Sequence, residues 1–217
     1  MLKKAWARHA VPLQNNIYEG HYKVGEQRAV PLQSCRAPTK LRYGGSFKEP
    51  IKKMTESSKK TTKILFICMG NICRSPSAEA VMQALVKQQG LEKQIICDSA
   101  GTLDYHRGNP ADARMQKHAR LRGYELNSIS RPFVNDDFEL FDWIITMDED
   151  NYQQIKWYDQ GNNYADKIRR MTDFCINVQV SAVPDPYYGG NQGFENVLDL
   201  LEDACQGLLE FVTLKKT

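Results

Sequence analysis

The stretch Lys63-Ile-Leu-Phe-Ile-Cys-Met-Gly-Asn-Ile-Cys-Arg-Ser-Pro76 decides the fold. After Lys63 comes a short apolar run ending at Cys68, which is typical of a central parallel strand buried on both faces. The run breaks in a polar loop that contains a glycine. A helix is predicted to follow this loop, with Ser75 as its N-cap and Pro76 at its first helical position. The stretch therefore predicts a strand, a loop and a helix in direct succession.

The same alternation of strand and helix continues to the end of the chain. Further strands are predicted over 94–98, 142–147 and 167–174, and further helices over 109–123, 148–157 and 194–212. The last helix is the clearest, because its apolar residues fall on one face. Together these elements predict an α/β fold: a four-stranded parallel sheet flanked by helices on both faces, doubly wound and Rossmann-like. In such sheets ligands bind beyond the carboxyl ends of the strands.

Composition excludes several classes of protein. Of 217 residues, 41% are hydrophobic and 25% are charged, which is ordinary for a globular chain. No run approaches the roughly 18 apolar residues that a membrane-spanning helix needs, so stable membrane insertion is not expected. Neither the 6 Cys nor the 4 His show metal-ligand spacing, so no metal site is expected.

Charge divides the chain into a basic first part and an acidic remainder. Residues 1–60 hold 13 of the 29 Lys and Arg but 4 of the 26 acidic residues. They lack sustained periodicity, which predicts a flexible N-terminal extension, and residues 61–217 are predicted to form the domain.

The start of this extension resembles a targeting segment. The first 18 residues contain no acid, and residues 1–8 can form a short basic amphipathic helix. A transit peptide for a plastid or mitochondrion is one interpretation. The alternatives are a disordered tail on a cytoplasmic protein and a start codon placed upstream of Met54. The basic residues are scattered without interleaved aromatics, so nucleic acid is not an expected partner.

The loop after the first strand has the composition of an anion site. Gly70 and Asn71 tolerate the backbone turns that point successive N–H groups inward, and these amides join the N-terminus of the following helix. Arg74 adds a planar, two-pronged donor suited to phosphate. The same positive field stabilises a thiolate on Cys68, and Ser75 can donate a hydrogen bond to it. The loop therefore predicts a cysteine nucleophile inside a phosphate-binding site.

Two other interpretations of the loop are weaker. If Cys68 and Cys73 were only small core residues, Arg74 would lie beside a buried turn without a partner. A nucleotide-binding loop of the Walker type is excluded, because no Gly-Lys-Ser/Thr occurs in the chain.

A cysteine phosphatase also needs a proton donor for the leaving oxygen. Asp185 is the candidate, because two prolines stiffen the loop around it and the tyrosines that follow offer aromatic walls.

Four motifs together resemble those of the low-molecular-weight protein tyrosine phosphatase family in order and spacing. They are Cys68–Pro76, Asp98–Thr102, Thr146–Asp148 and Asp185–Gly189, and the resemblance covers about residues 62–214. By this resemblance Cys68 is the nucleophile, Arg74 the phosphate-binding arginine and Asp185 the general acid.

The resemblance also implies roles for the neighbours of these three residues. Asn71 and Ser75 would fix the loop and the thiolate, and Cys73 would close a protective disulfide with Cys68. Tyr187 and Tyr188 would be candidates for regulatory phosphorylation. The positions implied to line the phosphate loop or the substrate cleft are Met69, Gly70, Ile72, Cys73, Tyr105, His106, Tyr187 and Tyr188.

The predicted activity is hydrolysis of phosphotyrosine in proteins, and of small aryl phosphates, through a cysteinyl-phosphate intermediate. Neither a cofactor nor a metal is expected, because the loop supplies the positive field, and the chain is expected to be a monomer or a weak dimer.

Two alternatives remain open. An arsenate reductase shares the fold and the loop, but it relays a disulfide through further cysteines, whereas Cys97, Cys175 and Cys205 are predicted to be core thiols. A catalytically silent phosphotyrosine-binding module is disfavoured, because the nucleophile, the arginine and the acid are all intact.

Overall fold

The computed structural model describes residues 61–214, apart from the side chain of Tyr188. These residues form the strands β1 (Thr62–Cys68), β2 (Ile95–Gly101), β3 (Trp143–Thr146) and β4 (Ile168–Arg170). Their α-helices are α1 (Arg74–Gln88), α2 (Ala113–Leu121), α3 (Asp137–Leu140), α4 (Glu149–Tyr158) and α5 (Gly190–Leu214). The predicted N-terminal extension, residues 1–60, lies outside the described residues.

The strands form one parallel sheet in the order β2-β1-β3-β4. The chain leaves β1 toward β2 on one side and returns to β3 on the other side of β1. The strand order therefore reverses beside the carboxyl end of β1, which is where ligands bind in open parallel sheets. This arrangement confirms the predicted four-stranded parallel sheet.

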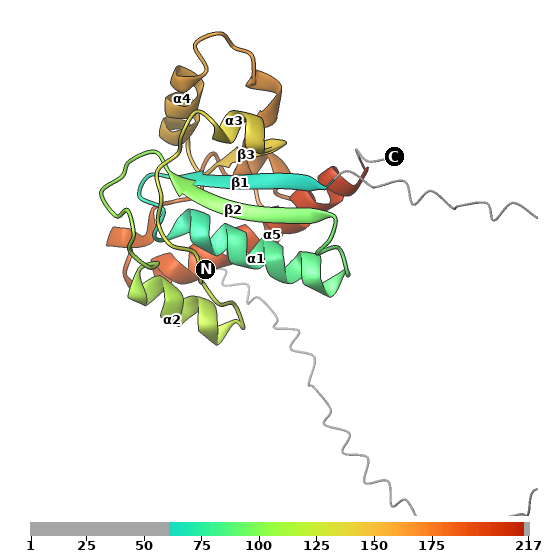
Figure 1. The fold of residues 1–217 in the computed structure, drawn as a ribbon. Coiled ribbons are helices and arrows are strands. Elements are labelled where there is room, and N and C mark those ends of the chain that lie inside the picture. Colours follow the sequence, from blue (N-terminus) through green and yellow to red (C-terminus); the bar gives the residue numbers. More distant parts are fainter. Residues whose placement is uncertain (1–60, 215–217) are drawn as a thin grey trace, which may run out of the picture. The chain divides into compact units, whose positions relative to one another are not determined.

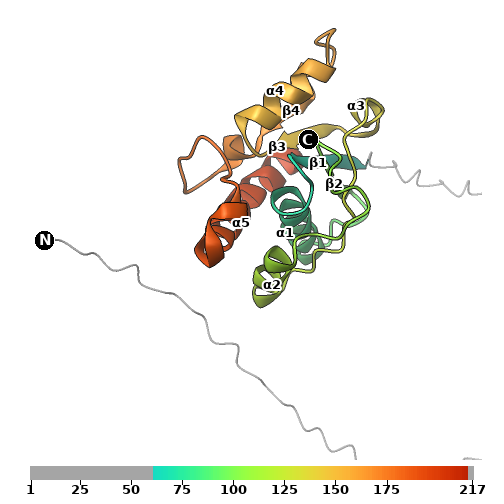
Figure 2. The ribbon, with the colours of Figure 1, turned by 90° about the vertical axis from the view of Figure 1, so that its left-hand side faces the viewer.

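Helices cover both faces of the sheet, with α1, α2 and α5 on one face and α3 and α4 on the other (Figures 1 and 2). The alternation along β1 explains why its whole run is apolar. Ile64 and Phe66 pack into the cluster with α1 and α5, whereas Leu65 and Ile67 pack into the cluster with α3 and α4. All four side chains are fully buried, and the predicted doubly wound architecture is confirmed.

Local sequence signals explain where several helices begin and end. The Asp112 carboxylate accepts backbone hydrogen bonds from the first turn of α2, and Gly123 follows that helix with a φ of 86°, as predicted for its left-handed cap. The Asp148 carboxylate accepts from Asn151 N at 2.7 Å and caps α4. The apolar face of α5 is buried along its length.

The structure differs from the sequence predictions at several points. Ser75 is not the N-cap of α1: Cys73 holds that position, and the Ser75 hydroxyl is used inside the loop. The predicted fourth strand is too long, because β4 ends at Arg170, where the Asp173 carboxylate accepts the Arg170 N–H at 3.1 Å and starts a 3-10 turn. The short helix α3 was not predicted.

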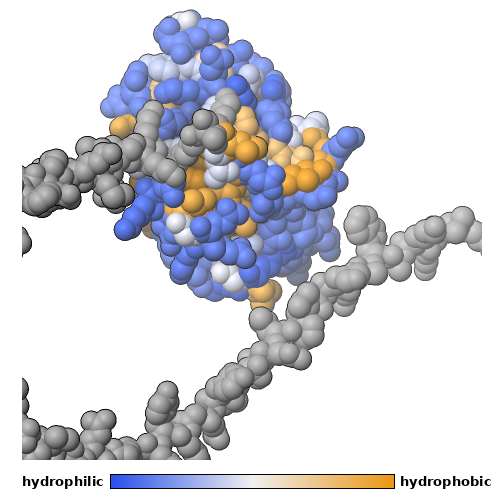
Figure 3. Space-filling view, turned by 90° about the vertical axis from the view of Figure 1, so that its right-hand side faces the viewer, coloured by the Kyte–Doolittle hydropathy of each residue, from blue (hydrophilic) through white to orange (hydrophobic). Residues whose placement is uncertain are grey.

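The two ends of the parallel strands lie on opposite sides of the domain. The carboxyl ends lie on the side seen in Figure 2. On the opposite side, hydrophilic side chains form the periphery and apolar side chains gather nearer the middle (Figure 3). Within residues 61–214, no helix is long and apolar enough to cross a membrane.

Candidate active site

Asn71 organises the loop between β1 and α1. Its φ of 54° lies in the left-handed region, which asparagine tolerates better than most residues. This conformation lets the Asn71 N–H donate to Cys68 Sγ at 3.3 Å, while the side-chain amide donates to Ser75 Oγ at 3.0 Å and to Ser99 Oγ at 2.9 Å. The loop is curled around the sulfur as the sequence predicts.

The predicted nucleophile, Cys68, lies at the carboxyl end of β1. Its Sγ is 3.1 Å from Ser75 Oγ and also receives the Asn71 N–H. The sulfur therefore lies within hydrogen-bonding distance of two groups of the loop and of α1.

A buried carboxyl group supports the loop from behind. Ser99, on β2, donates to Glu79 Oε2 at 2.6 Å, so Glu79, Ser99 and Asn71 form one hydrogen-bonded chain. Burial raises the pKa of Glu79 above its usual range. No sequence pattern indicated a role for Ser99 or Glu79, although Ser99 lies within one of the four motifs.

Two glycines allow the loop to pack closely against its neighbours. A Cβ on Gly101, at the end of β2, would lie 2.9 Å from both the Met69 and Leu103 carbonyl oxygens. A Cβ on Gly70 would lie 3.0 Å from His106 Cδ2. The end of β2 thus needs a glycine beside the loop, whereas a larger residue at Gly70 would meet the His106 side chain.

Arg74 begins α1 and is 4% exposed. One terminal nitrogen donates to Asp148 Oδ2 at 2.5 Å and to the Val183 carbonyl at 3.1 Å, and the other donates to Asp185 Oδ2 at 3.4 Å. Burial alone would lower the pKa of Arg74. The negative charges of Cys68, Asp148 and Asp185 have the larger opposite effect, so the pKa of Arg74 is raised. Asp148 orients the guanidinium, a role that the sequence analysis missed, although the residue lies in a motif quoted there.

Asp185, the predicted acid, precedes a 3-10 helix, Pro186–Tyr188. Its Oδ1 accepts the Tyr187 N–H at 3.0 Å. Arg114 of α2 donates to the Tyr187 carbonyl at 3.3 Å, and its guanidinium lies over the Tyr187 ring, 4.8 Å from the centroid. Asp112 accepts from Arg114 at 2.8 Å, and its N–H donates to the Ile72 carbonyl. Arg114 therefore links the two loops, which no local sequence pattern indicated.

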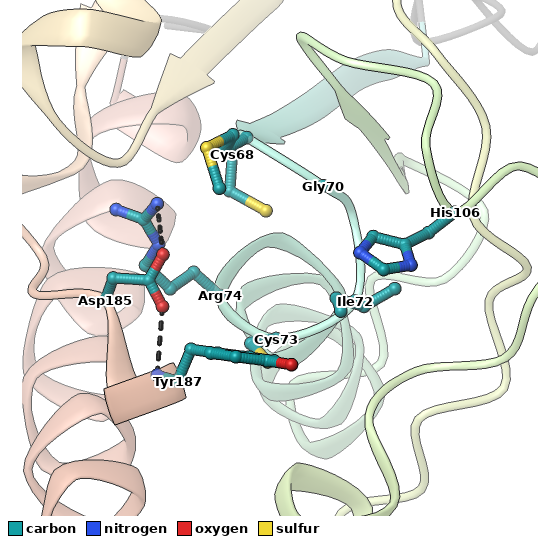
Figure 4. A pocket seen from close by; sticks show the side chains of 9 residues that line it. Cys68, Gly70, Ile72, Cys73, Arg74, His106, Asp185 and Tyr187 are labelled. Atoms are coloured by element: carbon teal, nitrogen blue, oxygen red, sulfur yellow. Dashed lines mark hydrogen bonds and ion pairs between the residues drawn. The ribbon is translucent and has the colours of Figure 1, made fainter. Parts of the chain in front are cut away.

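These side chains surround one pocket of about 220 Å³ at the carboxyl end of β1 (Figure 4). Across the pocket, Arg74 and Asp185 face the side that carries Ile72 and His106. Its lining residues are Cys68, Met69, Gly70, Ile72, Cys73, Arg74, His106, Asp185 and Tyr187. The structure thus brings together the three predicted catalytic residues and most of the predicted cleft.

The other predicted cleft residues have different positions. Tyr105 is 80% exposed and is not one of the residues lining the pocket. The side chain of Tyr188 lies outside the described part of the chain. Asn71 and Ser75 lie behind the loop, buried and bonded to each other.

The described cysteines are all free thiols. Cys73 lines the same pocket as Cys68, and burial, followed by the charge of Asp112, raises its pKa. Cys97 and Cys205 are buried core thiols as predicted, whereas Cys175 is only half-buried.

A parallel α/β fold that places a cysteine and an arginine in an amide-rich loop at its switch point, with the Asp185 carboxylate lining the same pocket, is the arrangement of a cysteine-dependent phosphatase. Comparison with known proteins supports this class. The family model of low molecular weight phosphotyrosine protein phosphatase matches residues 63–217. A candidate low molecular weight protein-tyrosine-phosphatase of Synechocystis is 49% identical over 68% of this chain and 94% of its own.

Two further relatives agree. The human low molecular weight phosphotyrosine protein phosphatase is 36% identical, covering 69% of this chain and 95% of its own. The crystal structure of a protein tyrosine phosphatase from Entamoeba histolytica, with Hepes in the active site, is 49% identical and superimposes with a TM-score of 0.70, covering 72% of this chain and 100% of that one. The chain therefore belongs to the low molecular weight phosphotyrosine protein phosphatase family. It is a protein-tyrosine-phosphatase, a hydrolase whose substrates are phosphoproteins.

Proposed function

We propose that Cys68, Arg74 and Asp185 carry out a two-step hydrolysis through a phosphocysteine. The observation that carries this assignment is their convergence on one pocket at the N-terminus of α1. The amides of the loop and the guanidinium of Arg74 offer donors for the equatorial oxygens of a phosphoryl group. Cys68 lies at the base of this loop, and its sulfur is the nucleophile that attacks phosphorus.

In the first step the Cys68 thiolate attacks phosphorus, and a phosphorus–sulfur bond forms as the bond to the aryl oxygen breaks. Asp185 gives its proton to the departing oxygen, so the alcohol leaves neutral. Asp148 holds the Arg74 guanidinium in position during this transfer, which places donors where charge accumulates.

In the second step water replaces the sulfur. Asp185, now a carboxylate, takes a proton from the water as its oxygen attacks phosphorus and the phosphorus–sulfur bond breaks. Inorganic phosphate leaves, and Cys68 returns to the thiolate, which Ser75 and the Asn71 N–H stabilise. All the groups required belong to this chain, so we propose no cofactor and no metal.

The proposed substrates are phosphotyrosyl proteins or peptides and small aryl phosphates. His106 and Tyr187 line opposite parts of the pocket, and their flat rings suit an aromatic leaving group. We propose Tyr105, Tyr187 and Tyr188 as further contacts at the cleft rim and Tyr187 and Tyr188 as sites of regulatory phosphorylation.

Nucleic acid is not among the proposed partners, and we propose a monomer or a weak dimer.

Steady-state hydrolysis of matched phosphotyrosyl and phosphoseryl peptides, with a metal chelator present, tests this function. The tyrosyl peptide should be preferred by about a hundredfold in kcat/KM, because only it fills the aromatic part of the pocket. Equal rates on both peptides would contradict the proposal, and so would loss of activity with the chelator.

We also propose that the site is redox-regulated through Cys73. Cys68 and Cys73 line one pocket, so a Cys68 sulfenic acid formed by peroxide lies near a thiol with which it can condense to a disulfide, releasing water. Cys73→Ser should keep its activity but lose recovery by a dithiol after peroxide treatment. Full recovery of the variant's activity by the dithiol would show that the protective disulfide does not form.

The proposed compartment is the cytoplasm. The free thiols of the described cysteines fit a reducing environment. A transit peptide in residues 1–60 would instead send the domain to a plastid or a mitochondrion. Imaging of fluorescent fusions to the full chain and to residues 61–217 distinguishes these locations, because only a targeting segment makes the two patterns differ.

A further inference from the structure

A groove of about 620 Å³ adjoins the catalytic pocket. It shares Met69, Arg74 and Asp185 with the pocket, and its remaining wall consists of residues 182–184 and the start of α4. In Figure 4 the shared residues Arg74 and Asp185 lie on the side of the pocket opposite His106. A polypeptide whose phosphotyrosine occupies the pocket can therefore extend past Asp185 into this groove.

The α4 side of the groove presents a carboxylate that no group in residues 61–214 neutralises. Asp148 is already bonded to Arg74, and Glu149 is paired with Arg170 at 2.6 Å. Asp150 lines the groove and is exposed, and it has no ion pair or hydrogen bond with the described residues. Its negative charge is therefore available to a group that enters the groove.

A second acceptor lies beside this carboxylate. Asn151 is 2% exposed and lines the groove, and its Oδ1 has no hydrogen-bond donor among the described residues. A buried carbonyl oxygen without a donor is costly, so such an atom is usually matched by a donor from elsewhere. Because this oxygen is enclosed by protein, the group that is open to a ligand in the groove is the Asp150 carboxylate.

We propose that this groove is a substrate subsite that binds a basic side chain, arginine or lysine, flanking the phosphotyrosine in the same polypeptide. The inference rests on the proposed function, because the phosphotyrosine must occupy the Cys68 pocket. A guanidinium or ammonium group supplies several N–H donors and a positive charge, which match the Asp150 carboxylate. The aliphatic stem of the same side chain can pack on Met69, which is 48% exposed.

Matched phosphotyrosyl peptides test the subsite. In each series one position, up to three residues before or after the phosphotyrosine, carries arginine, glutamine or glutamate. At the position that reaches the groove, kcat/KM should be about fivefold higher with arginine than with glutamine, because a partly exposed charge pair contributes modestly. Glutamate should be the poorest, and the preference should shrink at high salt.

Two variants and a control locate the effect. Asp150→Asn should bring the arginine-to-glutamine ratio of kcat/KM close to one, whereas Gln154→Glu, which adds a charge to the groove lining, should raise it. Asp166→Asn removes one charge from an exposed residue that does not line the groove, so it should keep the wild-type ratio.

The outcomes separate the subsite from the proposed function. If aryl phosphate and all peptides turn over but arginine, glutamine and glutamate give equal kcat/KM at every position, the subsite is wrong and the function stands. A preference that survives in Asp150→Asn also overturns the subsite. If neither peptide nor aryl phosphate is hydrolysed, the proposed function and the subsite fall together.

Discussion

The loop that carries Cys68 and the loop that carries Asp185 differ in how they are held. The first is buried apart from Met69: Asn71, Arg74 and Ser75 are all less than 5% exposed, and hydrogen bonds run from the loop to β2 and α1. The second is open, since the Asp185 side chain is 39% exposed and Tyr187 is 45% exposed.

Besides a backbone hydrogen bond from the Val183 N–H to the Met147 carbonyl, the hydrogen bonds that attach the second loop come from arginines. Arg74 donates to Val183 and Asp185, and Arg114 donates to Tyr187. The difference suggests a division of labour: the phosphate site is built in advance, whereas the proton donor is held by side chains that can adjust. Substitutions in the two loops should therefore have different signatures.

The largest effect is expected at the centre of the buried loop. Cys68→Ser should lower kcat at least about a thousandfold, because a serine hydroxyl does not ionise at neutral pH. Binding of inorganic phosphate should persist, since the loop amides and Arg74 remain, and inhibitor titration or calorimetry measures it. Turnover above a thousandth of wild type would remove Cys68 from its assigned role.

A substitution in the open loop should lower the rate of the chemical step rather than weaken substrate binding. Asp185→Asn should lower kcat about a hundredfold for phosphotyrosine but much less for a nitrophenyl ester, because only the poorer leaving group needs a proton in the transition state. Rates on a series of aryl phosphates measure this dependence. An equal loss for all leaving groups would show that Asp185 is not the acid.

Crowding the buried loop should affect both stability and rate. In Gly101→Ala the new Cβ would meet two backbone carbonyls at 2.9 Å, so the loop must shift, at a cost of about 1–3 kcal/mol in the free energy of unfolding. A roughly tenfold loss of kcat/KM should accompany this shift.

Gly193→Ala is the matched control for this crowding. Its Cβ makes no contact shorter than 3.5 Å, so denaturant unfolding should show no loss of stability. If Gly101→Ala proved as stable and active as this control, close packing of the Cys68 loop against the end of β2 would not matter.

The link between the loops should show a smaller effect. Arg114→Ala removes the hydrogen bond to the Tyr187 carbonyl and the contact with the Tyr187 ring, so kcat on phosphotyrosine should fall about fivefold. The loss should be smaller for a nitrophenyl ester, because Arg114 acts through the position of Asp185. Arg114→Lys should recover part of it, and a change in KM alone would contradict this role.

The smallest effect is expected far from both loops. The catalytic groups lie within residues 61–214, so deleting residues 1–60 should leave kcat and KM nearly unchanged. Kinetics and thermal unfolding of the truncated chain measure this. Loss of folding, or a roughly tenfold fall in kcat/KM, would show that the domain boundary is wrong.

The two loops also differ in how far sequence predicts them. The apolar run to Cys68 and the Gly70-Asn71 pair predict a curled anion loop after a central strand, because these signals are local. Ser75 was assigned as a helix cap on an equally local rule. The structure uses its hydroxyl for Cys68 and Asn71 instead, because tertiary contacts override the propensity to cap.

The contacts that hold the two loops in place could not be predicted. The chain from Asn71 through Ser99 to Glu79 connects residues that are close only after β1, β2 and α1 have packed. Arg114 lies on α2 and Asp148 precedes α4, so each reaches its partner only through tertiary packing. Asp148 belongs to one of the four motifs, but nothing local indicates that it bonds to Arg74.

Rapid-quench trapping of the phosphoryl group during turnover tests the central assignment most directly. Wild-type protein mixed with excess aryl phosphate should carry a phosphoryl group on Cys68, located by peptide mapping, and the group should be absent from Cys68→Ser. Asp185→Asn should accumulate more of it with a good leaving group, because the second step lacks its base. A phosphoryl group on another residue, or a burst of alcohol with Cys68 unmodified, would contradict the mechanism.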